Sequence, residues 1–130
     1  MAYLLTSGGQ ALIRDWLAGG NPTPPSYIAI GTSTLPVGRF ATVVGTETFR
    51  TSIVSADQDG ASVVFHGFLN ISDNAGNVMG NVGLFGGDSA TGQANTGTLV
   101  AIGNVPVPFV KSAADTYNID VTLLISGAVS

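Results

Sequence analysis

His66 is the only histidine of the chain, so a histidine-based metal site or a Ser–His–Asp triad would have to use it. It stands between Phe65 and Gly67, on the strand face opposite Phe65 and Leu69. No residue at a nearby spacing supplies a second metal ligand. We therefore interpret His66 as a structural or surface histidine and not as a catalytic base.

The acidic residues offer two further patterns. Residues 57–60 (DQDG) look like the start of a calcium loop, which needs a bidentate glutamate at its twelfth position. Phe68 occupies that position, so we expect a solvated hairpin turn here. Glu47, the only glutamate, precedes Arg50 by three residues, which indicates an ion pair or a hydrogen-bonding role at an element boundary. General acid–base chemistry needs a second carboxylate close in space, and the sequence indicates none.

The glycines and aromatic residues do not form a recognisable site either. Residues 76–87 (GNVMGNVGLFGG) are rich in glycine, but no Lys-Ser/Thr pair and no helix pattern follow, as a phosphate loop requires. The aromatic residues are separated and are not interleaved with basic ones. The chain has no cysteine. These patterns predict a protein that is not an enzyme and that holds no cofactor and no metal ion.

The composition points to a covered surface. The chain has 130 residues, which suits a single domain over 1–130, and only 9% of them are charged, where about 25% is typical. Its mean hydropathy is +0.40 and its net charge is −4. Uncharged polar residues cost much less to desolvate than charged ones, so we expect other protein to cover much of this surface.

Two classes of partner are disfavoured by the sequence. The four basic residues are scattered, whereas binding to nucleic acid phosphates needs a cluster. No segment approaches the roughly 20 apolar residues of a membrane span. The short apolar stretch at residues 1–5 has no basic lead-in, so it is not expected to be a secretory signal.

A helix is predicted over about residues 7–18. Ser7 is a candidate N-cap with Gln10 three residues later, and Gly19 and Gly20 mark the C-terminal end. The helix carries one apolar stripe that we expect to pack on the body of the domain, formed by Leu12, Ile13, Trp16 and Leu17.

The rest of the chain predicts an antiparallel β-sandwich over about residues 26–127, which makes the protein mainly β with one short N-terminal α-helix. Residues 31–46 form a long surface loop, residues 73–77 a turn, and residues 86–97 a polar loop. Gly80 and Gly83 indicate a bulge or a close backbone approach, and Pro106 and Pro108 indicate an edge or a departure from the sheet. The strands are expected at residues 27–30, 46–54, 61–72, 77–85, 98–107 and 116–126, the last with strict alternation.

The order of these segments resembles the small tail-fibre and baseplate attachment proteins, and the fibre N-terminal domains, of tailed bacteriophages. The matching positions are residues 28–31 (IAIG), Glu47 with Arg50, residues 83–85 (GLF), residues 99–103 (LVAIG) with Lys111, and residues 117–126. The family often has an acidic residue before the GLF strand, where this chain has Asn81 and Val82.

The resemblance implies a non-enzymatic virion structural protein, assembled in the host cytoplasm, in the tail, baseplate or fibre-attachment apparatus. Its partners would be itself, as a trimer, and other virion proteins. The contacts are expected from loops such as 31–46 and 86–97, and from an arm that contains Pro106 and Pro108 and reaches to adjacent subunits. The candidate interaction residues are Leu35, Val37, Phe40, Val105, Pro106, Val107, Pro108 and Phe109.

Two other functions fit the same residues. A capsid decoration protein would stabilise the head and occur in hundreds of copies per particle. A carbohydrate-binding module would recognise a host glycan through exposed aromatic residues and Asn/Asp loops. Copy number and glycan binding separate these alternatives from a tail protein.

Overall fold

The last strand shows how the sequence forms the sandwich. In the computed structural model, which describes residues 3–124, strand β8 (Tyr117–Leu124) buries Ile119, Val121 and Leu123 and exposes the residues between them. This alternation is the one predicted, and it turns one apolar face toward a second sheet. The remainder of the expected strand, residues 125 and 126, and the expected end of the sandwich at residue 127 lie outside the described residues.

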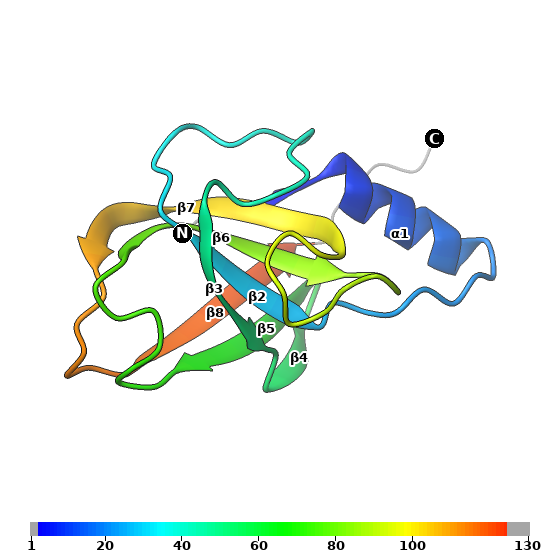
Figure 1. The fold of residues 1–130 in the computed structure, drawn as a ribbon. Helices are drawn as coiled ribbons and strands as arrows, with labels where there is room; N and C mark the ends of the chain where they lie inside the picture. The colour runs from blue at the N-terminus through cyan, green and yellow to red at the C-terminus, as the bar shows by residue number, and fades with distance from the viewer. Residues whose placement is uncertain (1–2, 125–130) are drawn as a thin grey trace.

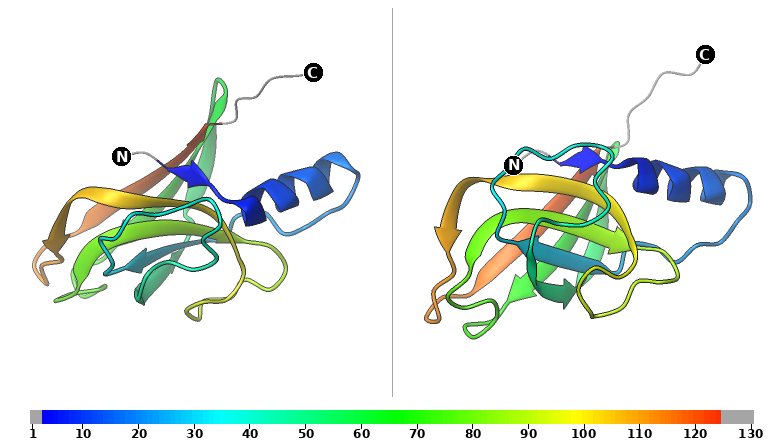
Figure 2. Two further views of the ribbon diagram at one scale, coloured as in Figure 1. Left: turned by 90° about the horizontal axis from the view of Figure 1, so that it is seen from above. Right: turned by 45° about the horizontal axis from the view of Figure 1, so that its top comes forward.

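The described residues form two antiparallel sheets and one helix (Figure 1). The larger sheet has the strand order β1-β7-β6-β2-β3, and the smaller has the order β4-β5-β8. Figure 2 shows the two layers from two further sides. The prediction of a mainly β sandwich with a short N-terminal helix is confirmed. The elements are β1 Leu4–Leu5, α1 Ser7–Leu17, β2 Tyr27–Gly31, β3 Glu47–Ser52, β4 Ser55–Asp59, β5 Ser62–Leu69, β6 Val78–Gly86, β7 Thr98–Val110 and β8 Tyr117–Leu124.

Apolar side chains pack on both faces of the larger sheet. The main core includes Ile28 and Ile30 of β2 together with Leu69 and Val121 of the smaller sheet, so it joins the two layers. A second, smaller core contains Phe85 and Ile102, and Val44, Val37 and Ala41 from the long loop pack with it. The larger sheet is therefore covered by the smaller sheet and by the long loop, and side chains from both of its faces are buried.

Helix α1 begins at Ser7 as predicted, but its N-cap lies one residue earlier than predicted. The N-cap is Thr6, not Ser7, because the Thr6 hydroxyl accepts a hydrogen bond from the Gly9 N–H at 3.0 Å. A Cβ on Gly9 would overlap the carbonyl oxygen of Val100 on β7, so the glycine allows the helix to begin directly against the sheet.

The apolar stripe of α1 packs less completely than expected. Leu12, Ile13 and Trp16 are half-buried, but Leu17 is 83% exposed. Gly19, with φ +94°, follows the C-cap as predicted. Within residues 3–124, no helix is long and apolar enough to span a bilayer.

The strand predicted over residues 46–54 corresponds to β3, which ends at Ser52, and a second strand that was not predicted, β4, begins at Ser55. Strand β3 belongs to the larger sheet and β4 to the smaller one, with Ile53 and Val54 between them. The Ile53 N–H donates to Ser26 beside β2, whereas the Val54 N–H donates to His66 on β5. The N–H groups of two consecutive residues thus bond to different sheets. The chain therefore crosses from the larger sheet to the smaller one at this edge of the sandwich.

The irregular positions of β6 and β7 match their glycines and prolines. The β6–β7 register shifts between Met79 and Asn81, which confirms the bulge predicted at Gly80. On β7, the pairing with β6 runs to Asn104 and resumes at Phe109. Pro106 and Pro108 lie between these positions, outside the ladder, as their missing N–H groups predict.

Candidate interaction surface

The long loop between β2 and β3, residues 32–46, is held at both ends and projects apolar side chains from its middle. The Thr32 and Ser33 N–H groups donate to the carbonyls of Thr46 and Gly45, both at 3.2 Å. Within the loop, the side chain of Val44 is buried, whereas those of Leu35 and Phe40 are 72% and 74% exposed. The loop is therefore a fixed projection over β7 (Figure 1).

The structure brings part of the loop next to the Pro-containing arm. The Asn104 side-chain amide donates to the Leu35 carbonyl at 2.9 Å, although the two residues are 69 positions apart. Phe40 lies farther along the loop, toward α1, because the Ser7 N–H donates to the carbonyl of neighbouring Arg39 at 2.7 Å. The Arg39 guanidinium lies over the Phe40 ring, 5.0 Å from its centroid.

The predicted interaction residues differ in exposure. Leu35, Phe40 and residues 106–109 are exposed, whereas Val37 and Val105 are half-buried. The side chain of Val107 is 78% exposed. We call Leu35, Val37, Phe40 and residues 105–109 the interaction surface.

An apolar groove of about 260 Å³ opens between β7 and β8, next to the arm. Val105 and Phe109 line one side, and Tyr117 and Ile119 line the other. The Phe109 and Tyr117 rings pack 5.3 Å apart between centroids. The sequence pattern did not predict this groove, because its walls come from strands of different sheets. We call it the β7–β8 groove.

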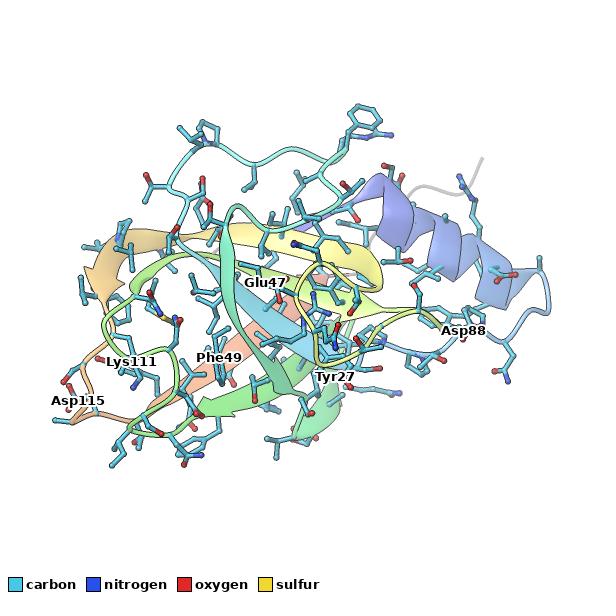
Figure 3. All side chains as sticks on the ribbon, viewed as in Figure 1. Tyr27, Glu47, Phe49, Asp88, Lys111 and Asp115 are labelled. Carbon is cyan, nitrogen blue, oxygen red and sulfur yellow. The ribbon has the colours of Figure 1, made fainter. Side chains whose placement is uncertain are left out.

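Glu47 and Arg50 form the predicted ion pair, but they form it inside the protein. Arg50 Nε and Nη2 donate to the two Glu47 carboxylate oxygens, each at 2.8 Å, and the side chains are only 2% and 1% exposed. The Arg50 guanidinium also lies 4.2 Å from the Phe85 ring centroid. Figure 3 shows Glu47 and Tyr27 near the loop that covers the pair. The pair is therefore buried and is not an exposed surface pair, which would contribute little to stability.

The covering loop, residues 87–97, is fixed by the same pair. Arg50 Nη1 donates to the carbonyls of Thr91 and Thr96 at 3.0 and 2.8 Å, and the Asn95 N–H donates to Glu47 at 3.1 Å. At the start of the loop, the Thr23 hydroxyl and N–H donate to Asp88, and both bonds lower the pKa of that carboxyl.

Lys111, which the family resemblance singled out, is a buried structural residue. It is 1% exposed, and its ammonium donates to the carbonyls of Asn70, Ile71 and Ser112 at 3.1, 3.2 and 2.8 Å. The backbone of Lys111 also bonds to Gly76 and Asn77. Lys111 thus joins the end of β7 to the predicted 73–77 turn (Figure 3).

His66 has two carboxylate partners on the outer face of the smaller sheet. Its Nδ1 lies 2.7 Å from Asp120 of β8, and its Nε2 lies 2.9 Å from Asp57 of β4. The hydrogen bond to Asp120 is the largest influence on His66, and together with that to Asp57 it raises the pKa of the imidazole. Asp57 and Asp59 lie in β4, so the expected turn is limited to Gly60 and Ala61. Sequence spacing missed this group because the sheet brings the residues together.

Residues 3–124 contain no cluster of three or more His, Cys, Asp or Glu side chains placed to hold a metal ion. The fold and the surface define a two-layered antiparallel β-sandwich with a fixed, apolar projection. No protein-family model matches the sequence, and neither the curated proteins nor the solved structures include a significant match.

Proposed function

We propose that this chain is a non-enzymatic structural protein of a tailed-phage particle, which acts in the tail, baseplate or fibre-attachment apparatus. It would work by binding copies of itself and neighbouring virion proteins through the interaction surface. The order of sequence motifs supports the class of particle. The exposed apolar side chains support the mode of action.

The observation that carries this proposal is the exposure of Leu35, Phe40 and Val107, each above 70%, on a chain with only 12 charged residues. Exposed apolar patches mark interaction sites, and the centres of protein interfaces are depleted in charge. The 32–46 loop of this surface is held at both ends by backbone hydrogen bonds, so little order has to be gained on binding.

Quantitative mass spectrometry of purified particles from the source of the chain tests the assignment. A few to tens of copies per particle are expected for a tail, baseplate or fibre protein. Hundreds of copies would instead assign the chain to the capsid surface as a decoration protein. Absence from the particles would overturn both assignments.

Variants of the interaction surface test the mode of action. Leu35→Asp and Val107→Asp are expected to fold normally and to enter particles much less well than the wild type. The matched control is Leu17→Asp, because Leu17 is also an exposed apolar residue, at 83%, but lies on α1. Equal incorporation of all three variants would show that this surface makes no contact. Light scattering measures whether the association is trimeric, as the resemblance implies.

A further inference from the structure

The sandwich has an open side between β7 and β8. On the opposite side, the link between β3 and β4 joins the two layers covalently. Here β1 pairs with β7 through only Leu4 and Leu5, and among the described strands β8 pairs with β5 alone. The β7–β8 groove opens on this side, so apolar side chains and a strand edge are accessible together.

The outer half of β7 and the edge strand β4 have features that oppose strand pairing. Pro106 and Pro108 remove N–H donors from the outer half of β7. All five residues of β4 are exposed, and two of them are aspartates. Strand β8 has no proline and no lysine over its eight residues. It therefore lacks these obstacles to strand pairing, and its edge can accept another strand.

The backbone of β8 shows which groups are available. The Tyr3 hydroxyl donates to the Asp120 carbonyl at 3.5 Å, so that carbonyl points away from β5. Orientation alternates along an antiparallel strand, so the backbone groups of Asn118, Thr122 and Leu124 point to the same open side. The Tyr3 contact is long for an O–H···O bond, and an incoming strand can replace it.

We propose that β8 pairs with β8 of a second copy, antiparallel and about a two-fold axis at Val121. This register places Asp120 opposite Thr122 and Asn118 opposite Leu124 of the second copy, so no carboxylate faces another. Centring the axis on Asp120 would place two carboxylates directly opposite each other, which is unfavourable. The apolar residues of β8 remain on the core face, and the smaller sheets of the two copies become one sheet.

The groove favours a protein strand over a small molecule. Its volume, about 260 Å³, is below the range of roughly 300–1,000 Å³ that is usual for small-molecule sites. Val105 and Phe109 face it from β7, beside the edge at which β8 of the second copy would pair. Such a contact is isologous, since both copies present the same residues. The pairing is independent of the proposed place in a particle, because it would form in purified protein.

Thr122 is exposed, and two substitutions that give it a negative or a positive charge test the register of the β8 pairing. Thr122→Asp places a new carboxylate opposite Asp120 at two symmetry-related positions, and we expect dimerisation to weaken about tenfold. Thr122→Lys pairs with the same aspartates, and we expect it to strengthen dimerisation by a similar factor at low salt. Gln58→Asp on β4 is the matched control and should leave the dimer unchanged. Sedimentation equilibrium of the full chain measures each dissociation constant.

Cysteine pairing tests the geometry directly, because the chain has no cysteine of its own. Asn118→Cys mixed with Leu124→Cys should give disulfide-linked heterodimers on mild oxidation, whereas each variant alone should link much less. Equal linking in all three samples, a monomeric wild type, or an oligomer insensitive to both Thr122 variants would overturn the β8 pairing. If such a protein still enters particles, the proposed function stands and only this contact is wrong.

Discussion

The Arg50 guanidinium and the Glu47 carboxylate form a two-point contact inside the protein, with both N–O distances at 2.8 Å. The contact joins β3 to the 87–97 loop, because both side chains also bond to the backbone of that loop. Removing one partner of a buried ion pair strongly destabilises a protein, because the other charge stays buried without compensation.

Glu47→Gln should lower the free energy of unfolding by about 3–5 kcal/mol, because it leaves the Arg50 charge buried without a counter-charge. Urea denaturation measures the change, and limited proteolysis should show earlier cleavage in the 87–97 loop. The exposed Asp59→Asn is the control and should change stability little. The double variant Glu47→Gln/Arg50→Met should recover part of the loss. A single variant as stable as the control would contradict the prediction.

Lys111→Met should lower the free energy of unfolding by about 1–3 kcal/mol, because three backbone carbonyls lose their donor. Methionine keeps most of the buried volume, so the lost hydrogen bonds dominate the effect. Arg14→Met removes the same charge from an exposed helix position and should be nearly neutral. Thermal unfolding of the two variants side by side decides the matter, and equal melting temperatures would refute the role given to Lys111.

The stability of the protein should fall as the pH rises above the ordinary histidine pKa of 6.5. The folded state raises the pKa of His66, so protonated His66 stabilises the fold fully below that value. The contribution is lost as the pH passes through the raised folded-state pKa. Urea midpoints at about pH 6 and pH 9 measure this, and His66→Gln should remove that part of the pH dependence. An NMR titration with an unshifted imidazole would count against the contact with Asp120.

Gly83→Ala should destabilise the protein by about 1–3 kcal/mol through overpacking. A Cβ at this position would lie 2.5 Å from Val44 Cγ1 and 2.8 Å from Leu99 Cδ1. Val44→Ala in the same chain should offset part of the effect. Gly38→Ala is the control, because open space surrounds Gly38. Chemical denaturation compares them, and a Gly83→Ala protein as stable as the control would disprove the close packing.

Local patterns predicted much of the fold. The alternation of buried and exposed residues in β8 follows from the two-residue period of a strand. The interruption of β6–β7 pairing at Pro106 and Pro108 follows from their missing N–H donors. The split between β3 and β4 could not be predicted this way. Its cause is that the Ile53 and Val54 N–H groups bond to Ser26 and His66, which are distant in the sequence.

The side-chain clusters were harder to predict for the same reason. Glu47 and Arg50 look like a surface pair from their spacing, and only Phe85 and the 87–97 loop bury them. Asp57 and Asp120 reach His66 from strands nine and 54 positions away. Sequence periodicity describes which face a residue occupies, but it does not describe which distant strand lies beside it.

Strand β4, which is exposed and acidic, limits how many copies of the chain can join through the smaller sheet. Two copies joined at β8 would present β4 at both outer borders of the shared sheet, each with Asp57 and Asp59. Carboxylates at such borders repel further copies, so the shared sheet terminates itself at six strands and does not extend into a fibril.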